Sequence, residues 1–176
     1  AKTENLNFAL ALADPSFMHD YRLPGMAIDG KLKADGTRYA TNLTLREGTG
    51  IVKLKGSASI PTNAKGDLLM AGISYDADMS INRLNLHHFM PRDSIYTITA
   101  DVKAKGYGTD FLSNKSKLTA SAKIHQLQYG SWDLKQMNAE ATLANGHALA
   151  SITGHNQLLQ GTIGVDAMLN TKKLMA

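Results

Sequence analysis

Residues 95–104 read Ile-Tyr-Thr-Ile-Thr-Ala-Asp-Val-Lys-Ala, and this stretch decides the fold class of the chain. Positions of one parity are apolar: Tyr96, Ile98, Ala100, Val102 and Ala104. The positions between them are mostly polar: Thr97, Thr99, Asp101 and Lys103. Because successive side chains of a β-strand point to opposite faces, this alternation predicts a strand with one buried and one solvated face.

The same alternation recurs on both sides of this stretch. Apolar positions alternate with Lys and Ser over 52–60, and with Thr, Ser and Lys over 118–124. They alternate with Asn, Glu and Thr over 138–143. Segments of this kind at a spacing of about ten residues predict an antiparallel meander.

Turn signals separate the predicted strands. Asn145-Gly146 supplies the two positive-φ positions of a two-residue hairpin turn. Asp35-Gly36 and Glu47-Gly48 predict two further turns. Gly106 and Gly108 predict a bulge or a close backbone approach.

Two regions depart from the strand pattern, and one of them, Asp110 to Lys115, predicts a bend. Between residues 84 and 92 the apolar residues lose strict alternation before Pro91, which predicts one short helix. The opening segment, Leu6 to Leu12, predicts one more strand, followed by an irregular loop. The whole pattern predicts an all-β fold: a long antiparallel meander curled into an open trough or half-barrel with an apolar interior. Residues 1–176 are expected to be one β-rich segment excised from a longer protein.

The composition limits the function classes. With 176 residues and 43% hydrophobic residues, the chain is long enough to form one β domain with a core. Cysteine is absent, which excludes disulfides, thiolate metal ligands and cysteine nucleophiles. The net charge of +4 is scattered over alternate positions, whereas nucleic-acid binding needs a basic stripe with aromatics. No apolar run reaches the length of about 18 residues that spans a bilayer, so any anchor is expected outside this segment.

No residue pattern predicts catalysis, a cofactor or a metal. His87-His88 is the strongest metal candidate, but neighbouring residues point to different sides and no partner follows at a suitable spacing, which favours a structural role. Gly130-Ser131-Trp132 lacks the closing glycine of a nucleophile elbow. Asp76-Ala77-Asp78 has the carboxylate spacing of a calcium loop, but Ile81 stands where the glycine is needed.

The apolar face has two interpretations. It is an ordinary core if a second layer covers it, and a groove for acyl chains if the strands curl into an open trough, because hydrocarbon needs only apolar contact. The residues predicted to line this interior are Val52, Leu54, Ala58, Ile60, Ile98, Ala100, Val102, Leu118, Ala120, Ala122, Ile124, Ala139, Ala141, Leu143, Ile163, Val165 and Ala167.

Several consecutive stretches resemble the mid-chain region of AsmA/TamB-like proteins. They are Leu84–Pro91, Ala100–Asp110, Leu118–Ile124, Leu127–Gly130 and Leu134–Gly146. The resemblance rests on a strand that ends in Gly-x-Gly, the strand that follows it, and a hairpin that ends in glycine. It covers residues 80–170 in pattern and the rest of the chain more loosely.

The resemblance implies a non-catalytic segment of a periplasmic envelope-biogenesis protein of Gram-negative bacteria, anchored in the inner membrane. Its apolar groove, a β-taco, would serve phospholipid transport or outer-membrane protein assembly and secretion. The implied partners are phospholipid acyl chains, neighbouring β segments of the same chain, and an outer-membrane assembly protein that binds regions outside this segment. No nucleic acid and no cofactor are implied.

Two alternatives stand beside this reading. A closed β-sandwich that binds glycan or protein would present aromatics on loops, for which Phe17, Tyr21 and Trp132 are the candidates. An enzyme with a dispersed site would need carboxylates that point inward from strands, whereas most Asp and Glu here occupy polar positions or turns.

Overall fold

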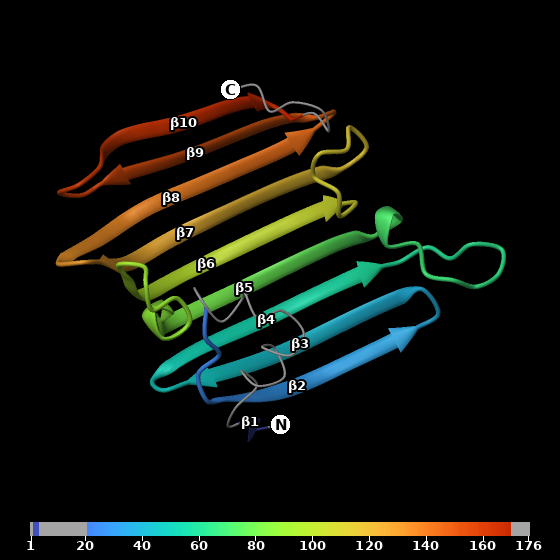
Figure 1. Ribbon diagram of the computed structural model, residues 1–176, viewed down its shortest axis with the longest axis horizontal. Coiled ribbons are helices and arrows are strands. Elements are labelled where there is room, and N and C mark those ends of the chain that lie inside the picture. Colours follow the sequence, from blue (N-terminus) through green and yellow to red (C-terminus); the bar gives the residue numbers. More distant parts are fainter. Residues whose placement is uncertain (1, 4–20, 170–176) are drawn as a thin grey trace.

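The computed structural model describes residues 2–3 and 21–169, which form one antiparallel sheet (Figure 1). Each strand pairs with the next one in the sequence, so the sheet is a pure meander. The strands are β1 (Lys2–Thr3), β2 (Met26–Asp35), β3 (Arg38–Glu47), β4 (Gly50–Ser59), β5 (Ser74–Asn85), β6 (Ile95–Tyr107), β7 (Lys117–Tyr129), β8 (Trp132–Ala144), β9 (His147–His155) and β10 (Gln160–Met168).

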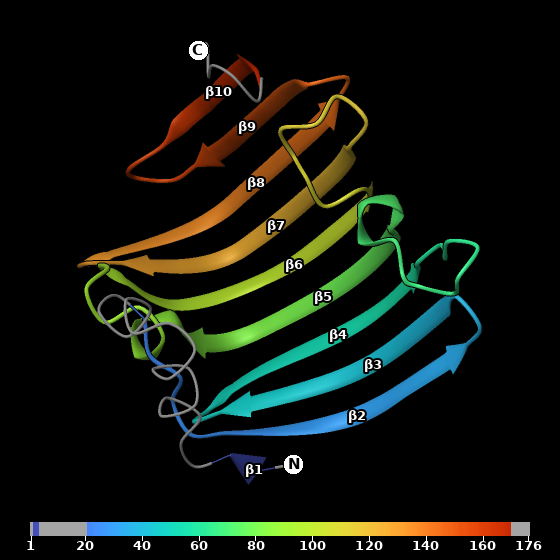
Figure 2. The same cartoon turned by 45° about the vertical axis from the view of Figure 1, so that its right-hand side comes forward.

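The sheet is open, because the edge strands β1 and β10 lie at opposite sides and do not pair with each other. Figures 1 and 2 show one twisted and curved layer, with the long strands bent along their length. The predicted all-β open meander is therefore confirmed. The strand predicted at Leu6 to Leu12 lies outside the described residues.

Helix is confined to two single turns in the described part of the chain. The helix predicted near residues 84–92 is the 3-10 turn η2 (Leu86–His88), which starts where the Asn85 side chain accepts a hydrogen bond from the His87 backbone N–H. The other is η1 (Met70–Gly72), in the connection from β4 to β5. Both are too short to form a layer over the sheet.

The turn chemistry explains the tight connections. Asn145 and Gly146 both have positive φ, at 56° and 75°, and join paired residues Ala144 and His147, as predicted. The β2–β3 turn consists of Gly36 and Thr37, one residue later than expected, because Asp35 still pairs with Arg38.

Strand β5 was missed in the sequence, although its alternation is clear. Tyr75, Ala77, Met79 and Ile81 share one parity, and each pairs with an apolar-face residue or a glycine of β4 and β6. Asp76 and Asp78, for which a solvated strand face or a loop was expected, lie on the solvated face of this strand. The register shifts between Ile81 and Leu84, where Arg83 has a positive φ of 51°, and such a bulge bends the strand.

The core is small for a chain of this length. Only a few apolar side chains are buried among the described residues: Leu84, Ala100, Leu134, Met137 and Leu143. Most other apolar residues of the sheet are half-buried or exposed. The described residues thus form one layer with a broad apolar face, and they provide no second sheet for the closed β-sandwich considered as an alternative.

Candidate apolar groove

The strand register arranges the apolar residues in rows that cross the sheet. One row carries small side chains through six consecutive strands from β4 to β9, and we call it the small-residue row. It consists of Gly56, Ala77, Ala104, Ala120, Ala141 and Ala150. Because these residues pair directly from strand to strand, the row is continuous and follows the direction perpendicular to the strands.

Larger residues form the neighbouring rows on the same face. The row on one side consists of Leu43, Leu54, Met79, Val102, Ala122, Ala139, Ile152 and Ile163. The row on the other side consists of Tyr39, Ala58, Tyr75, Gly106, Leu118, Leu143, Ala148 and Ala167. The face is therefore apolar from β3 to β10 without interruption by a charged side chain in these rows.

A hollow of about 330 Å³ lies on this face over β6–β10. It forms where two neighbouring rows both carry alanine, at Ala120 and Ala141 in one row and Ala122 and Ala139 in the next. Larger side chains bound the hollow: Val102, Ile152, Ile163 and Val165. The hollow is thus a shallow apolar depression of the sheet surface.

The structure places the predicted interior residues on this one face. All of them except Ile60 lie in strands and belong to the rows that pair across the sheet. Ile60 follows directly after β4. The prediction missed the apolar residues of β3, β5 and β9, whose alternation is equally visible in the sequence: Leu43, Leu45, Met79, Ile81, Ala150 and Ile152.

The apolar face stays accessible toward the sheet edges. Leu32 on β2 is 71% exposed, and Ile163 and Val165 on β10 are each 59% exposed. Contiguous exposed apolar surface marks interaction or ligand-binding sites in soluble proteins.

One end of the strands is covered by the chain itself. Residues 86–94, which we call the rim segment, follow β5 and lie beside the stretch 21–23. The Arg22 backbone N–H donates a hydrogen bond to the Phe89 carbonyl at 2.7 Å. Leu84, Leu86, Phe89 and Met90 line a small apolar hollow between them. This cover explains why the buried residue Leu84 lies at this end of the sheet.

A buried carboxylate ties the rim segment to the sheet. Glu47, at the end of β3, is 5% exposed, and its Oε1 lies 2.7 Å from Nδ1 of His88. Asn85 Oδ1 accepts the His87 N–H, so its Nδ2 donates to His88 Nε2 at 3.0 Å. His88 Nδ1 therefore carries the proton and donates to Glu47. The partner of His88 comes from 41 residues away in the sequence, so no local spacing could have revealed it.

The His88→Ala substitution is expected to lower the free energy of unfolding by about 1.5–3 kcal/mol, because it leaves the Glu47 carboxylate buried without its hydrogen-bond donor. Urea denaturation followed by circular dichroism measures this loss. Replacing the exposed His155 by alanine is the matched control and should leave the midpoint unchanged. Equal midpoints for the His88 variant and the control would contradict the structural role assigned to His88.

His87, also in the rim segment, makes contacts of its own. Its ring stacks on Tyr96 with a centroid distance of 4.7 Å, and its Nδ1 lies 3.0 Å from the Asp93 carbonyl oxygen, to which it donates. The two neighbouring histidines therefore serve different contacts, in agreement with the structural role favoured above. Among the described residues, no group of three His, Asp or Glu side chains is placed to hold a metal.

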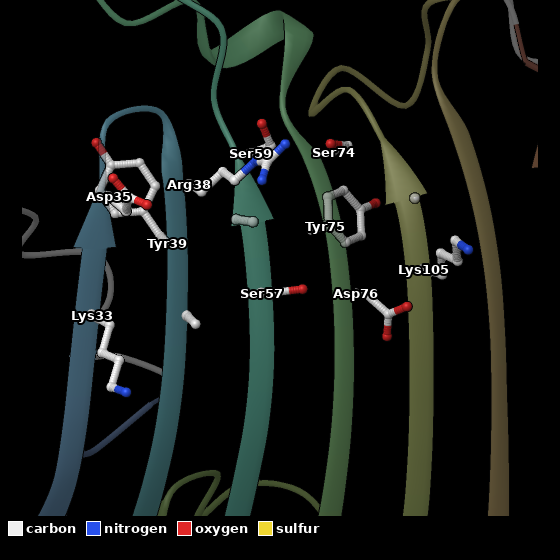
Figure 3. Close-up of a pocket in the computed structure, with 13 residues that line it drawn as sticks. Lys33, Asp35, Arg38, Tyr39, Ser57, Ser59, Ser74, Tyr75, Asp76 and Lys105 are labelled. Atoms are coloured by element: carbon white, nitrogen blue, oxygen red, sulfur yellow. The ribbon is translucent and has the colours of Figure 1, made fainter.

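A second hollow, of about 450 Å³, lies near the other end of β2–β6 (Figure 3). Tyr39 and Tyr75 contribute to it from the apolar-face rows, and charged side chains of the other parity lie around it: Lys33, Asp35, Arg38, Asp76 and Lys105. The Tyr75 ring lies over Gly106, where a Cβ atom would collide with the ring. This is the close approach predicted at Gly106. The Tyr75 hydroxyl is buried without a hydrogen-bond partner.

The opposite face of the sheet is polar. Cross-strand pairs join Lys103 to Asp78 at 3.9 Å and His125 to Asp101 at 2.8 Å. The hydrogen bond from His125 is the main reason why the pKa of the Asp101 carboxyl lies below its usual value, with a second hydrogen bond from Ser80. These pairs are exposed, and such pairs contribute little to stability. This face is therefore the solvent-facing side of the sheet.

The described part of the chain contains no helix long and apolar enough to cross a membrane. Comparison of the chain with family models, with curated proteins and with solved structures found no match.

Proposed function

We propose that this sheet is a non-catalytic lipid-handling segment whose apolar face holds the acyl chains of phospholipid. The observation that carries the proposal is the set of uninterrupted apolar rows across the sheet, over a hollow that none of the described residues covers. Hydrocarbon suits such a surface because it makes apolar contacts and has no polar groups to satisfy.

The dimensions of the face support this ligand class. From β3 to β10 the rows cross seven strand spacings of about 4.8 Å, which makes about 34 Å. The hydrocarbon core of a bilayer is about 30 Å thick, so the acyl chains of one leaflet reach about 15 Å. The face is therefore long enough for two acyl chains placed end to end along the rows.

The chemistry of the face fits transport better than tight binding. Each methylene removed from water contributes about 0.8 kcal/mol, so a chain lying in the rows gains affinity from many weak contacts. Among the described residues, the hydroxyls of Tyr39 and Tyr75 are the only polar side-chain groups in the rows named above, and no charged group lies there to fix a headgroup in one position. A chain can therefore slide along the face with little change in free energy.

The resemblance to AsmA/TamB-like proteins adds the cellular setting to the proposal. In this setting the segment belongs to a periplasmic protein of a Gram-negative bacterium that is anchored in the inner membrane through residues outside the segment. Neighbouring β segments would continue the groove, and an outer-membrane assembly protein would bind elsewhere on the chain. The function is then phospholipid transport or support of outer-membrane protein assembly and secretion.

Binding of glycan or protein is the second candidate function. The observation that favours it is a pair of exposed aromatics, Tyr129 and Trp132, which flank the β7–β8 turn. An enzyme is less supported, because Glu47 is the only carboxylate that the described strands place on the apolar side, and His88 already occupies it. If the chain is a sugar-binding module, glycan should co-purify with it and phospholipid should not.

Native mass spectrometry of the protein from a bacterial envelope fraction tests the proposal. Phospholipid should co-purify with the wild type. Ala141→Phe fills the hollow and is expected to reduce the bound lipid about tenfold, because displacing two methylenes costs about 1.6 kcal/mol. Thr142→Phe, next to it on the polar face, is the matched control and should keep the lipid. A folded wild-type monomer without lipid would overturn the proposal and favour the second candidate.

A further inference from the structure

Two loops at one end of the strands carry large exposed apolar residues at their tips. The first connects β4 to β5 and contains Leu68, Leu69 and Met70. The second connects β6 to β7 and contains Phe111 and Leu112. These five side chains are 44% to 50% exposed. We call residues 61–73 and 108–116 the tip loops.

The tip loops lie on the same end of the sheet. In an antiparallel meander, the connections that follow alternate strands lie at the same end of the sheet. The β4–β5 and β6–β7 loops therefore share one end, and the rim segment lies at the opposite end. The Gly108 backbone N–H donates to the Ile73 carbonyl at 2.8 Å and joins the two loops at their base. Figures 1 and 2 show both loops projecting beyond the strand ends on the same side.

The loops satisfy much of their own backbone hydrogen bonding. In the first loop the Asn63 side chain accepts the N–H groups of Lys65 and Asp67, and the Pro61 carbonyl accepts that of Leu69. In the second loop the Asp110 carboxylate accepts the Leu112 N–H, and the Ser113 N–H donates to the Asp110 carbonyl. An irregular loop can enter an apolar phase only when its polar backbone groups are satisfied in this way.

The charged side chains near the tips suit the headgroup layer of a phospholipid bilayer. Each tip loop carries one lysine and one aspartate, so neither loop has a net charge. Asp67 accepts a hydrogen bond from the Asn63 amide and Asp110 accepts one from the Leu112 N–H. Lys65 and Lys115 are exposed beside the apolar tips, where their long side chains reach lipid phosphate.

We propose that the tip loops insert into the surface of a phospholipid bilayer and bring the open apolar face to its lipid source. Exposed apolar side chains from two separate loops come together at one end of the sheet. A fluid hydrocarbon layer accepts such an end without a matching shape. This inference deepens the proposed lipid function and rests on it.

Co-sedimentation with vesicles of phosphatidylethanolamine and phosphatidylglycerol tests the inference. The wild type should bind. The double variant Leu69→Ser with Phe111→Ser should bind at least about tenfold more weakly, because it removes one large apolar side chain from each tip. The matched control is Leu158→Ser, a 53% exposed leucine in the β9–β10 turn at the opposite end of the strands, and it should bind like the wild type.

A second measurement places the loop in the membrane directly. With Phe111→Trp in a Trp132→Phe background, vesicles of brominated lipid should quench the fluorescence. Binding of the wild type and the double variant with equal strength, or no quenching at position 111, would overturn the inference. A protein that binds vesicles through these loops but carries no phospholipid in native mass spectra would retain the inference and overturn the proposed lipid transport.

Discussion

The Val102→Asp variant is expected to fold normally and to lose nearly all of its bound phospholipid. Val102 lies in the row beside the small-residue row, at the border of the hollow, and its side chain is half-buried. A carboxylate at this position keeps contact with water because the described residues form no second layer over it, so the fold survives. The same carboxylate would lie against the acyl chain, where an unpaired charge costs several kcal/mol.

The matched control for this variant is Ser121→Asp. Ser121 pairs with Lys103 on the polar face, and the residue after it, Ala122, pairs with Val102 on the apolar face. The control adds the same charge one residue away but on the solvated side. Native mass spectrometry should find lipid on the control and none on Val102→Asp, while circular dichroism spectra of both match the wild type. Unfolding of Val102→Asp would instead indicate that the face is a closed core.

The Ala100→Asp variant is expected to lose about 3–5 kcal/mol of stability, since it places an uncompensated charge in a buried site. Ala100 is two residues from Val102 on the same face, but it is only 1% exposed. Its cross-strand neighbours are Ile81 and Ile124, toward the end where the rim segment covers the sheet. Substitution by aspartate should therefore destabilise the protein strongly at position 100 and leave it folded at position 102.

Urea denaturation of the two variants side by side measures this contrast. Ala100→Val provides a control for added volume without charge, and its cost should be about 1–3 kcal/mol, as for other overpacked sites. Similar stability of Ala100→Asp and Val102→Asp would contradict the division of the face into a covered end and an open groove.

The strands were largely predictable because alternation is a local property. The stretch 95–104 and the Asn145-Gly146 turn each carry their own signal within a few residues. Strand β5 carries the same signal, but its full length was not predicted, because carboxylates at alternate positions fit a solvated strand face or a loop equally well. The apolar parity of Tyr75 to Ile81 distinguishes the strand from a loop.

The groove could be predicted only in part, because its shape depends on register. The sequence shows that Ala120 and Ala141 have the parity of the interior, but only the pairing of β7 with β8 brings them side by side to form the hollow. The contact between Glu47 and His88 joins segments that lie 41 residues apart in the sequence. Such long-range geometry has no signature in local composition.

The most direct test of the account is a photocrosslinking scan along β7. A photoreactive residue is placed in turn at Thr119, Ala120, Ser121 and Ala122, and the purified protein is irradiated with its bound lipid. The account predicts phospholipid adducts at Ala120 and Ala122 and none at Thr119 and Ser121, because only the first pair lies on the apolar face. Adducts at all four positions, or at none of them, would contradict the claim that one face of this open sheet holds lipid.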